Sequence, residues 1–139
     1  MQVTFGKEGG RSIVVTVQLR HNDVTVARPP DVVAFDAITE LRPQLLALLK
    51  ESGCRHLVLD MSSIDYFDSS GLAMLLGVRH QSQAAGAAPT LAAPPSFISR
   101  MLNITQAITI LIVAPSVHEA LRTRHRTRRD DAQGADHLY

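Results

Sequence analysis

Two hydroxyl groups and a carboxylate stand next to one another near the middle of the chain, at Asp68, Ser69 and Ser70. They lie between a short apolar run, residues 56–60, and a long helical pattern, residues 72–83. Asp and Ser are common N-cap residues, so one interpretation is an ordinary helix cap. A Ser at a helix N-terminus is also well placed to carry a phosphate, because the dianion would face unsatisfied N–H groups and the positive end of the helix dipole. The segment is therefore either a plain cap or a regulatory phosphorylation site.

The helical pattern after these residues is apolar on two faces. Leu72, Leu75 and Leu76 form the stripe that we expect to face the core. Met74 and Val78 lie one turn apart on roughly the opposite face. An apolar strip beside a modifiable Ser predicts a partner-binding surface that a phosphate could switch. The alternative is that Met74 and Val78 are covered by a neighbouring helix or by the C-terminal tail.

Three aspartates follow one predicted strand, at Asp60, Asp65 and Asp68. Carboxylates grouped in this way can bind Mg²⁺, so a magnesium-dependent enzyme is a competing hypothesis. No Gly-rich phosphate loop and no Gly-x-Ser-x-Gly elbow accompany them, and the six histidines show no metal-ligand spacing. We therefore expect a protein that is not an enzyme, with no catalytic residue, no metal and no cofactor.

The elements that position this segment can be read from hydrophobic periodicity and turn residues. The expected strands are residues 13–19, 24–27, 56–60, 89–93 and 108–113, of which the last is the clearest. The expected helices begin near Thr39, after Asp68, after a cap at Ser96 and after a cap at Ser116. The first of them is capped by Asp36 or Thr39, and Gly86 ends the second. Strands that alternate with helices predict an α/β fold, with a mixed, mostly parallel sheet of about four to five strands flanked by about four helices.

Composition limits the classes of function. The 139 residues suit one domain with a real core, and the net charge of +1 gives no electrostatic basis for binding nucleic acid. Aromatic residues are scarce, with no Trp, two Tyr and four Phe, so stacking platforms for bases are not expected. Cys54 is the only cysteine, which excludes an internal disulfide. Neither a signal peptide nor an apolar run of the roughly 18 residues that a membrane span needs is apparent, so we expect a cytoplasmic protein.

The last part of the chain differs in composition from the rest. Residues 122–129 hold five arginines, two aspartates follow directly, and large apolar residues are absent until Leu138. Charges of both signs with little apolar surface are typical of a solvated tail rather than of a binding arm. We expect a domain over residues 1–122 and a disordered, basic and polar tail over residues 123–139.

Three stretches of the sequence together resemble a known family. They are residues 57–60 (Leu-Val-Leu-Asp), residues 64–72 (Ile-Asp-Tyr-Phe-Asp-Ser-Ser-Gly-Leu) and residues 75–77 (Leu-Leu-Gly). In this order they resemble the signature of bacterial anti-sigma-factor antagonists, which belong to the STAS domain family. The similarity in the order of elements extends from about Ile13 to Leu121, which is nearly the whole chain.

The resemblance implies a partner switch controlled by phosphorylation. In that family the Ser directly after the Asp, here Ser69, is phosphorylated by a partner that is both an anti-sigma factor and a serine kinase. The unphosphorylated antagonist binds this partner and frees the sigma factor; phosphorylation breaks the complex, and a serine phosphatase restores it. The resemblance places Asp68, Ser70 and Gly71 on the same partner surface. It implies no direct DNA binding, and a weak homodimer is compatible with it.

One region departs from the family pattern. Family members usually carry a glycine-glutamate-aliphatic-aspartate turn after the second strand, and this turn contributes to the partner surface. Here residues 28–36 read Arg-Pro-Pro-Asp-Val-Val-Ala-Phe-Asp, so Asp31 and Asp36 are the candidates to replace it. The departure favours a second hypothesis, a non-cycling STAS scaffold or sensor that works in a signalling complex without phosphorylation.

Overall fold

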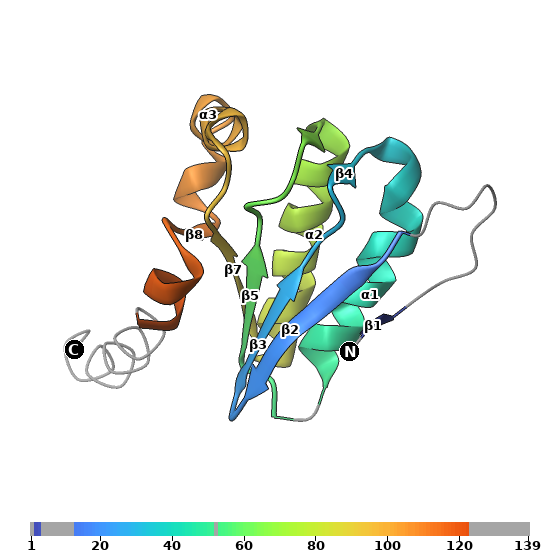
Figure 1. The fold of residues 1–139 in the computed structure, drawn as a ribbon, viewed down its shortest axis with the longest axis vertical. Coiled ribbons are helices and arrows are strands. Elements are labelled where there is room, and N and C mark those ends of the chain that lie inside the picture. The colour runs from blue at the N-terminus through green and yellow to red at the C-terminus, as the bar shows by residue number, and fades with distance from the viewer. Residues whose placement is uncertain (1, 4–12, 52, 123–139) are drawn as a thin grey trace.

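The main sheet is built around the apolar run of residues 56–60. In β5 (His56–Asp60) the central residues Leu57, Val58 and Leu59 are buried, as expected for a strand that is covered on both faces. The computed structural model describes residues 2–3, 13–51 and 53–122, and its main sheet has the strand order β1-β2-β3-β5-β7-β8 (Figure 1). The other strands of this sheet are β1 (Gln2–Val3), β2 (Val15–His21), β3 (Val24–Arg28), β7 (Ala88–Ala92) and β8 (Ile112–Ala114).

The sheet is mixed, and most of it is parallel. β1 and β3 both pair with β2 in the antiparallel sense, while the β3–β5, β5–β7 and β7–β8 pairs are parallel. The predicted α/β architecture, with a mixed and mostly parallel sheet, is therefore confirmed. The two-residue strand β1 is not among the predicted elements, and it extends the sheet to six strands.

Helices cover the two faces of the sheet unequally. The helices α1 (Ile38–Lys50), α2 (Ser69–Ala85) and α3 (Ser96–Ile104) bury the larger hydrophobic core against one face. The other face is covered by a helical segment, residues 117–122, whose apolar side chains pack on those of β3, β5, β7 and β8. In Figure 1, α1 and α2 lie side by side, and α3 lies beyond β7 at the β8 end of the sheet.

Two of the predicted helix boundaries are confirmed by their local chemistry. Gly86 ends α2 in the left-handed conformation, with φ of 75°, which glycine adopts without strain. Ser116 caps the last helical segment, because its Oγ accepts a hydrogen bond of 3.0 Å from the backbone N–H of Glu119.

Two other predicted caps are wrong. The N-cap of α1 is the last residue of the 3₁₀ turn η2 (Phe35–Ala37) and makes no side-chain hydrogen bond, so neither Asp36 nor Thr39 caps this helix. The chain is already helical when it enters α1, which removes the need for a separate cap. The N-cap of α3 is Pro95, and Ser96 is the first residue of the helix.

The predicted strand over residues 108–113 is also wrong in extent. Gln106 adopts a left-handed conformation, with φ of 65°, and the 3₁₀ turn η3 (Ala107–Thr109) follows it. The Thr109 hydroxyl donates a 2.7 Å hydrogen bond to the Gln106 carbonyl, and the Leu111 N–H donates one of 2.9 Å back to the first residue of η3. These local bonds compete with ladder pairing, so only the three residues of β8 join the sheet.

A buried amide ties α1 to the start of β2. Gln44 is 1% exposed, and its Oε1 accepts a 2.8 Å hydrogen bond from the N–H of Val15. Its Nε2 donates to the carbonyls of Ile13 and Glu40, both at 2.9 Å. The side chain is thus held by three hydrogen bonds, as a buried polar group requires.

The predicted C-terminal tail, residues 123–139, lies outside the described residues. The division of the chain at residue 122 therefore stays a prediction. Among the helices that the structure describes, none is long and apolar enough to cross a membrane.

Candidate functional site

Asp68 is the residue that caps α2. Its backbone is extended, with φ of −115° and ψ of −174°, and its Oδ1 accepts hydrogen bonds from the N–H groups of Ser70 at 3.0 Å and Gly71 at 3.3 Å. One carboxylate oxygen therefore satisfies two of the first N–H groups of the helix. Among the described residues, the hydroxyls of Ser69 and Ser70 have no part in this cap, so they are available for another role.

Ser69 is the first residue of the 17-residue helix α2, and it is exposed. Within the described part of the chain its backbone N–H has no protein acceptor, whereas the next two N–H groups donate to Asp68. An anion carried on Ser69 would therefore meet a free N–H group and the positive end of a long helix. Ser70 is half-buried, so the two neighbouring serines differ in their exposure.

A small second sheet brings the region that departs from the family pattern beside this helix. β4 (Val32–Val33) pairs in parallel with β6 (Tyr66–Phe67), far along the chain. The carbonyl of Asp31 extends this pairing, because it accepts hydrogen bonds from the N–H groups of Asp65 at 2.7 Å and Tyr66 at 3.2 Å. The segment that leads into Ser69 and the segment that leads into α1 are therefore joined directly.

Gly71 allows the start of α2 to rest on this small sheet. A Cβ atom at this position would lie 2.8 Å from Cε2 of Phe67, which is closer than real contacts, and 3.0 Å from Cγ1 of Val33, which is a very tight contact. Gly71 is itself buried. It therefore shapes the surface around Ser69 without forming part of that surface.

The predicted partner residues Asp31 and Asp36 are both exposed, and they have different neighbours. Asp36 lines an open hollow of about 400 Å³ between the start of α1 and the start of α2, which we call the Ser70 hollow. Its lining residues are Phe35, Asp36, Ile38, Thr39, Arg42, Ser70 and Ala73. Asp31 is not among them, since its backbone holds it against β6. The structure thus brings Asp36 together with Ser70, and Asp31 together with Tyr66.

The prediction that Met74 and Val78 form an exposed strip is wrong. Met74 is 3% exposed and Val78 is fully buried, and both belong to the larger core. The buried stripe of α2 runs through Gly71, Met74, Leu75, Val78 and Ser82, at the spacing of one helix face. Because this stripe begins with a glycine and ends with a serine, a search for large apolar residues does not find it. The two residues therefore cannot contact a partner in the folded protein.

The three aspartates are engaged separately. Oδ1 of Asp60 accepts hydrogen bonds from Ser62, at 3.1 Å from its N–H and 2.7 Å from its hydroxyl, and Oδ2 pairs with Arg28 at 3.1 Å. Burial acts against ionisation of Asp60, but the Ser62 and Arg28 contacts outweigh it together and hold the pKa of this carboxyl below its usual range. Asp68 caps α2, and Asp65 is exposed. Within the described residues, no three acidic, His or Cys side chains are grouped so that they could hold a metal ion.

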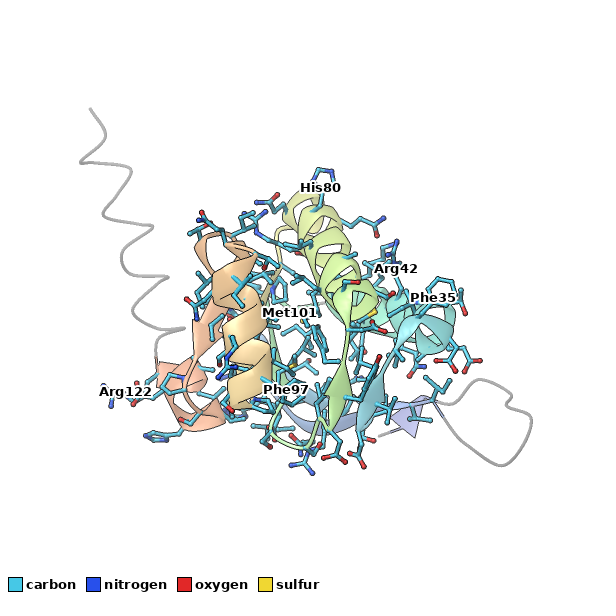
Figure 2. The ribbon with its side chains drawn as sticks, turned by 90° about the horizontal axis from the view of Figure 1, so that it is seen from above. Phe35, Arg42, His80, Phe97, Met101 and Arg122 are labelled. Atoms are coloured by element: carbon cyan, nitrogen blue, oxygen red, sulfur yellow. The ribbon has the colours of Figure 1, made fainter. Side chains whose placement is uncertain are left out.

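Three exposed side chains near the site were not found from the sequence. Phe35 is 78% exposed and Tyr66 is 51% exposed, and they come from the two segments that the small sheet joins. Arg42 lines the Ser70 hollow, and Figure 2 shows Phe35 and Arg42 on the side of α2 that is opposite to α3. The sequence holds a signal for Tyr66 alone, since aromatic residues are scarce and Tyr66 stands three residues before Ser69.

Comparisons with known proteins agree with this fold. The STAS domain, as a family sequence model, matches residues 15–120. Among solved structures, a STAS domain protein from Planctomyces limnophilus has a TM-score of 0.69 at 17% identity, with 78% of this chain and 96% of that chain covered. A candidate anti-sigma factor antagonist from Thermotoga maritima has a TM-score of 0.68 at 16% identity, with coverage of 78% and 92%.

The third comparison is with SpoIIAA, a cell fate determinant of Bacillus, in its phosphorylated form. Its TM-score is 0.61 at 14% identity, with 78% of this chain and 97% of that chain covered. At such identities the solved structures establish the fold, while the sequence match establishes the family. Since that match spans most of the chain, the protein belongs to the STAS domain family, and it has the fold of the anti-sigma-factor antagonists.

Proposed function

We propose that this protein is an anti-sigma-factor antagonist whose binding to its partner is switched off by phosphorylation of Ser69. The observation that carries the proposal is the exposed Ser69 hydroxyl at the first position of α2, directly after the capping residue Asp68. Membership of the STAS domain family supports it. So does SpoIIAA, which has been solved in unphosphorylated and phosphorylated forms and shares this fold.

The partner is an anti-sigma factor that also acts as a serine kinase. In the unphosphorylated state the protein binds this partner in the cytoplasm and frees the sigma factor, so it regulates transcription without touching DNA. A serine phosphatase returns the phosphorylated protein to the binding state. The bound surface includes Asp68, Ser70, Asp31 and Asp36. Gly71 is buried beneath this surface and sets its shape.

The switch follows from the cost of placing a dianion in an interface. A phosphate adds a charge of about −1.5 to −2, and on Ser69 it would stand beside the carboxylate of Asp68. In the free protein, water and the positive end of α2 stabilise this charge. In a complex, the partner would remove water from this charge next to Phe35 and Tyr66, which are exposed aromatic side chains. Phosphorylation therefore weakens the complex without a change of fold.

The proposal is tested by measuring how Ser69 variants bind the candidate anti-sigma factors of the same genome. Ser69→Ala should bind as the unmodified protein does and remain bound when ATP is added. Ser69→Asp should lose more than about a hundredfold in affinity, because it places a charge where the interface is desolvated. Ser70→Ala and Ser70→Asp are the matched controls one residue away. Because Ser70 belongs to the bound surface, we expect Ser70→Ala to bind more weakly, but to release its partner when ATP is added, as the unmodified protein does.

Equal affinity of Ser69→Ala and Ser69→Asp would refute the switch. If both bound tightly, the protein would be the non-cycling scaffold or sensor that the departure over residues 28–36 favours. Isothermal titration calorimetry distinguishes these cases directly, since it reports the affinity of each variant for the same partner.

A further inference from the structure

The guanidinium group of Arg42 lies flat against α2. A Cβ atom placed on Gly77 would be 3.8 Å from Nη2, 3.9 Å from Cζ and 3.9 Å from Nη1 of Arg42. Since three atoms of the planar group are almost equally distant from one point, its face is turned toward that point. The glycine leaves room for this arrangement. Arg42 thus reaches across from α1 and rests on the neighbouring helix.

The donor edge of this guanidinium is unused. Among the described residues, no hydrogen bond and no ion pair involves the Arg42 side chain, which is exposed. A guanidinium has five N–H donors in a rigid fork that matches a carboxylate. Because contact with Gly77 restricts the side chain, less conformational freedom remains to be lost when an anion binds.

Arg42 stands where two open hollows meet. The Ser70 hollow shares Ile38, Thr39 and Arg42 with a second hollow of about 480 Å³, the Leu46 hollow, which continues along α1 to Pro43 and Leu46. From Phe35 to Leu46 the helical rise is roughly 16 Å, the length of about five extended residues. Both hollows are open and follow the exposed side of α1, so together they form a shallow groove about as long as a short extended segment.

The charges in this groove favour one kind of ligand. Among the described residues that line the two hollows, Arg42 is the only cation and Asp36 is the only anion. A carboxylate carries one negative charge and can pair with Arg42, whereas a phosphate dianion would also meet stronger repulsion from Asp36. Pro43 and Leu46 offer apolar contact on the side of Arg42 away from Asp36, and Ile38 lines both hollows.

We infer that the groove binds an extended segment of the partner protein, in which an Asp or Glu pairs with Arg42 and an adjacent apolar side chain packs in the Leu46 hollow. The inference deepens the proposed function, on which it rests for the existence of a partner. It names a specificity-determining residue, Arg42, that lies outside the serine segment. It also gives Gly77 a role, since this residue seats the guanidinium.

The test uses the full-length protein and a displayed library of random linear peptides of about twelve residues. We expect the selected peptides to share an acidic residue next to an apolar one. Arg42→Gln should weaken binding of the best synthetic peptide at least tenfold. Replacing the acidic residue of the peptide by its amide should weaken binding to the same extent. Both changes together should cost no more than either alone, because they remove the same contact.

Variants of two other residues serve as controls. Arg100→Gln removes the same charge from α3, on the other side of α2, and should leave the affinity unchanged (Figure 2). Gly77→Ala should also leave it unchanged, since the added Cβ makes only ordinary contact with Arg42. Gly77→Leu should weaken binding as Arg42→Gln does, because it displaces the guanidinium.

Selected peptides without an acidic residue, or an affinity that Arg42→Gln leaves intact, would overturn the inference. Failure to recover any binding peptide would also count against the inference. So would self-association of the protein, if Arg42→Gln abolished that self-association. These results are independent of phosphate on Ser69. If the groove bound acidic peptides but Ser69 were never phosphorylated, the switch would be refuted and the groove inference would stand. If Ser69 were phosphorylated but the groove bound no acidic peptide, only the switch would stand.

Discussion

At the scale of single residues, the two hydroxyls of Ser69 and Ser70 are neighbours in sequence but have different surroundings. Ser69 is exposed, and its own N–H has no acceptor in the part of the chain that the structure describes, whereas Ser70 donates its N–H to Asp68 and lines the Ser70 hollow. From the residue types alone, either serine could carry a phosphate. The resemblance to a family singles out Ser69, and the helix geometry supplies a physical reason for that choice.

The two glycines of α2 allow a matched prediction about packing. Gly71→Ala should destabilise the protein by about 1–3 kcal/mol, because the new Cβ would lie 2.8 Å from the ring of Phe67. Gly77→Ala is the control on the same helix, where the nearest atom is 3.8 Å away. It should be neutral or raise the stability by up to about 1 kcal/mol, since Ala favours helix more than Gly. Urea denaturation measures both changes.

Equal stability of the two variants would show that the small sheet can move away from α2. The close contact of Gly71 with Phe67 and Val33 would then not be what positions the start of the helix.

The buried carboxyl of Asp60 predicts a dependence of stability on pH. Its pKa is below the unfolded value of about 3.9, so its contacts with Ser62 and Arg28 stabilise the fold above that pH. This contribution is lost as the pH falls through the folded-state pKa. In urea denaturation from pH 7 to pH 2, the difference in unfolding free energy between the natural protein and Asp60→Asn should therefore shrink below about pH 4.

Asp65→Asn is the control for this pH series, because Asp65 is exposed. Its difference from the natural protein should stay small at every pH. A difference for Asp60→Asn that stays constant down to pH 2 would show that the Asp60 contacts do not depend on its charge.

At the scale of elements, α2 shows why periodicity identified a helix but chose the wrong face. The helix carries large apolar side chains on several faces, and the predicted stripe lay beside the true one. Leu72 and Leu75 are buried as expected, but Leu76 is only half-buried. Met74 lies among Leu41 and Leu45 of α1 and Leu59 of β5, so the side of α2 that holds Met74 and Val78 faces the core.

Val78 gives the prediction that belongs to this element. Val78→Ala should cost about 1.5–3 kcal/mol of stability, from lost burial and the cavity that remains. Gln81→Ala, on the exposed side of the same helix, should change the stability by less than about 0.5 kcal/mol. Thermal or urea denaturation of the two variants measures the contrast. If Val78→Ala were as stable as Gln81→Ala, the assignment of this residue to the core would be incorrect.

At the scale of the whole molecule, the sequence predicted the architecture because each buried strand is short, apolar and bounded by turn residues. β5 was predicted at its observed boundaries, and α/β alternation fixed the parallel part of the sheet. Where prediction failed, local hydrogen bonds or a preceding 3₁₀ turn replaced the expected pattern, as at η3 and η2.

The candidate site could be predicted only in part, because its second half depends on pairing between distant residues. Ser69 and Asp68 lie in one continuous segment, so the sequence shows them together. The pairing of Val32–Val33 with Tyr66–Phe67 involves only two residues on each strand and leaves no periodic signal. This pairing brings Asp31 to the site, and the packing of α1 on α2 opens the Ser70 hollow beside Asp36. A surface assembled from two distant segments in this way can be recognised only when the fold is known.

The most direct test of the central claim is to locate the phosphate. The full-length protein is incubated with ATP and the anti-sigma kinase that binds it, and the modified residue is mapped by tandem mass spectrometry of the digested protein. We predict one phosphate on Ser69, none on Ser69→Ala, and unchanged phosphorylation of Ser69 in Ser70→Ala. Phosphate on Ser70, or no phosphate on a protein that the kinase binds, would contradict the account.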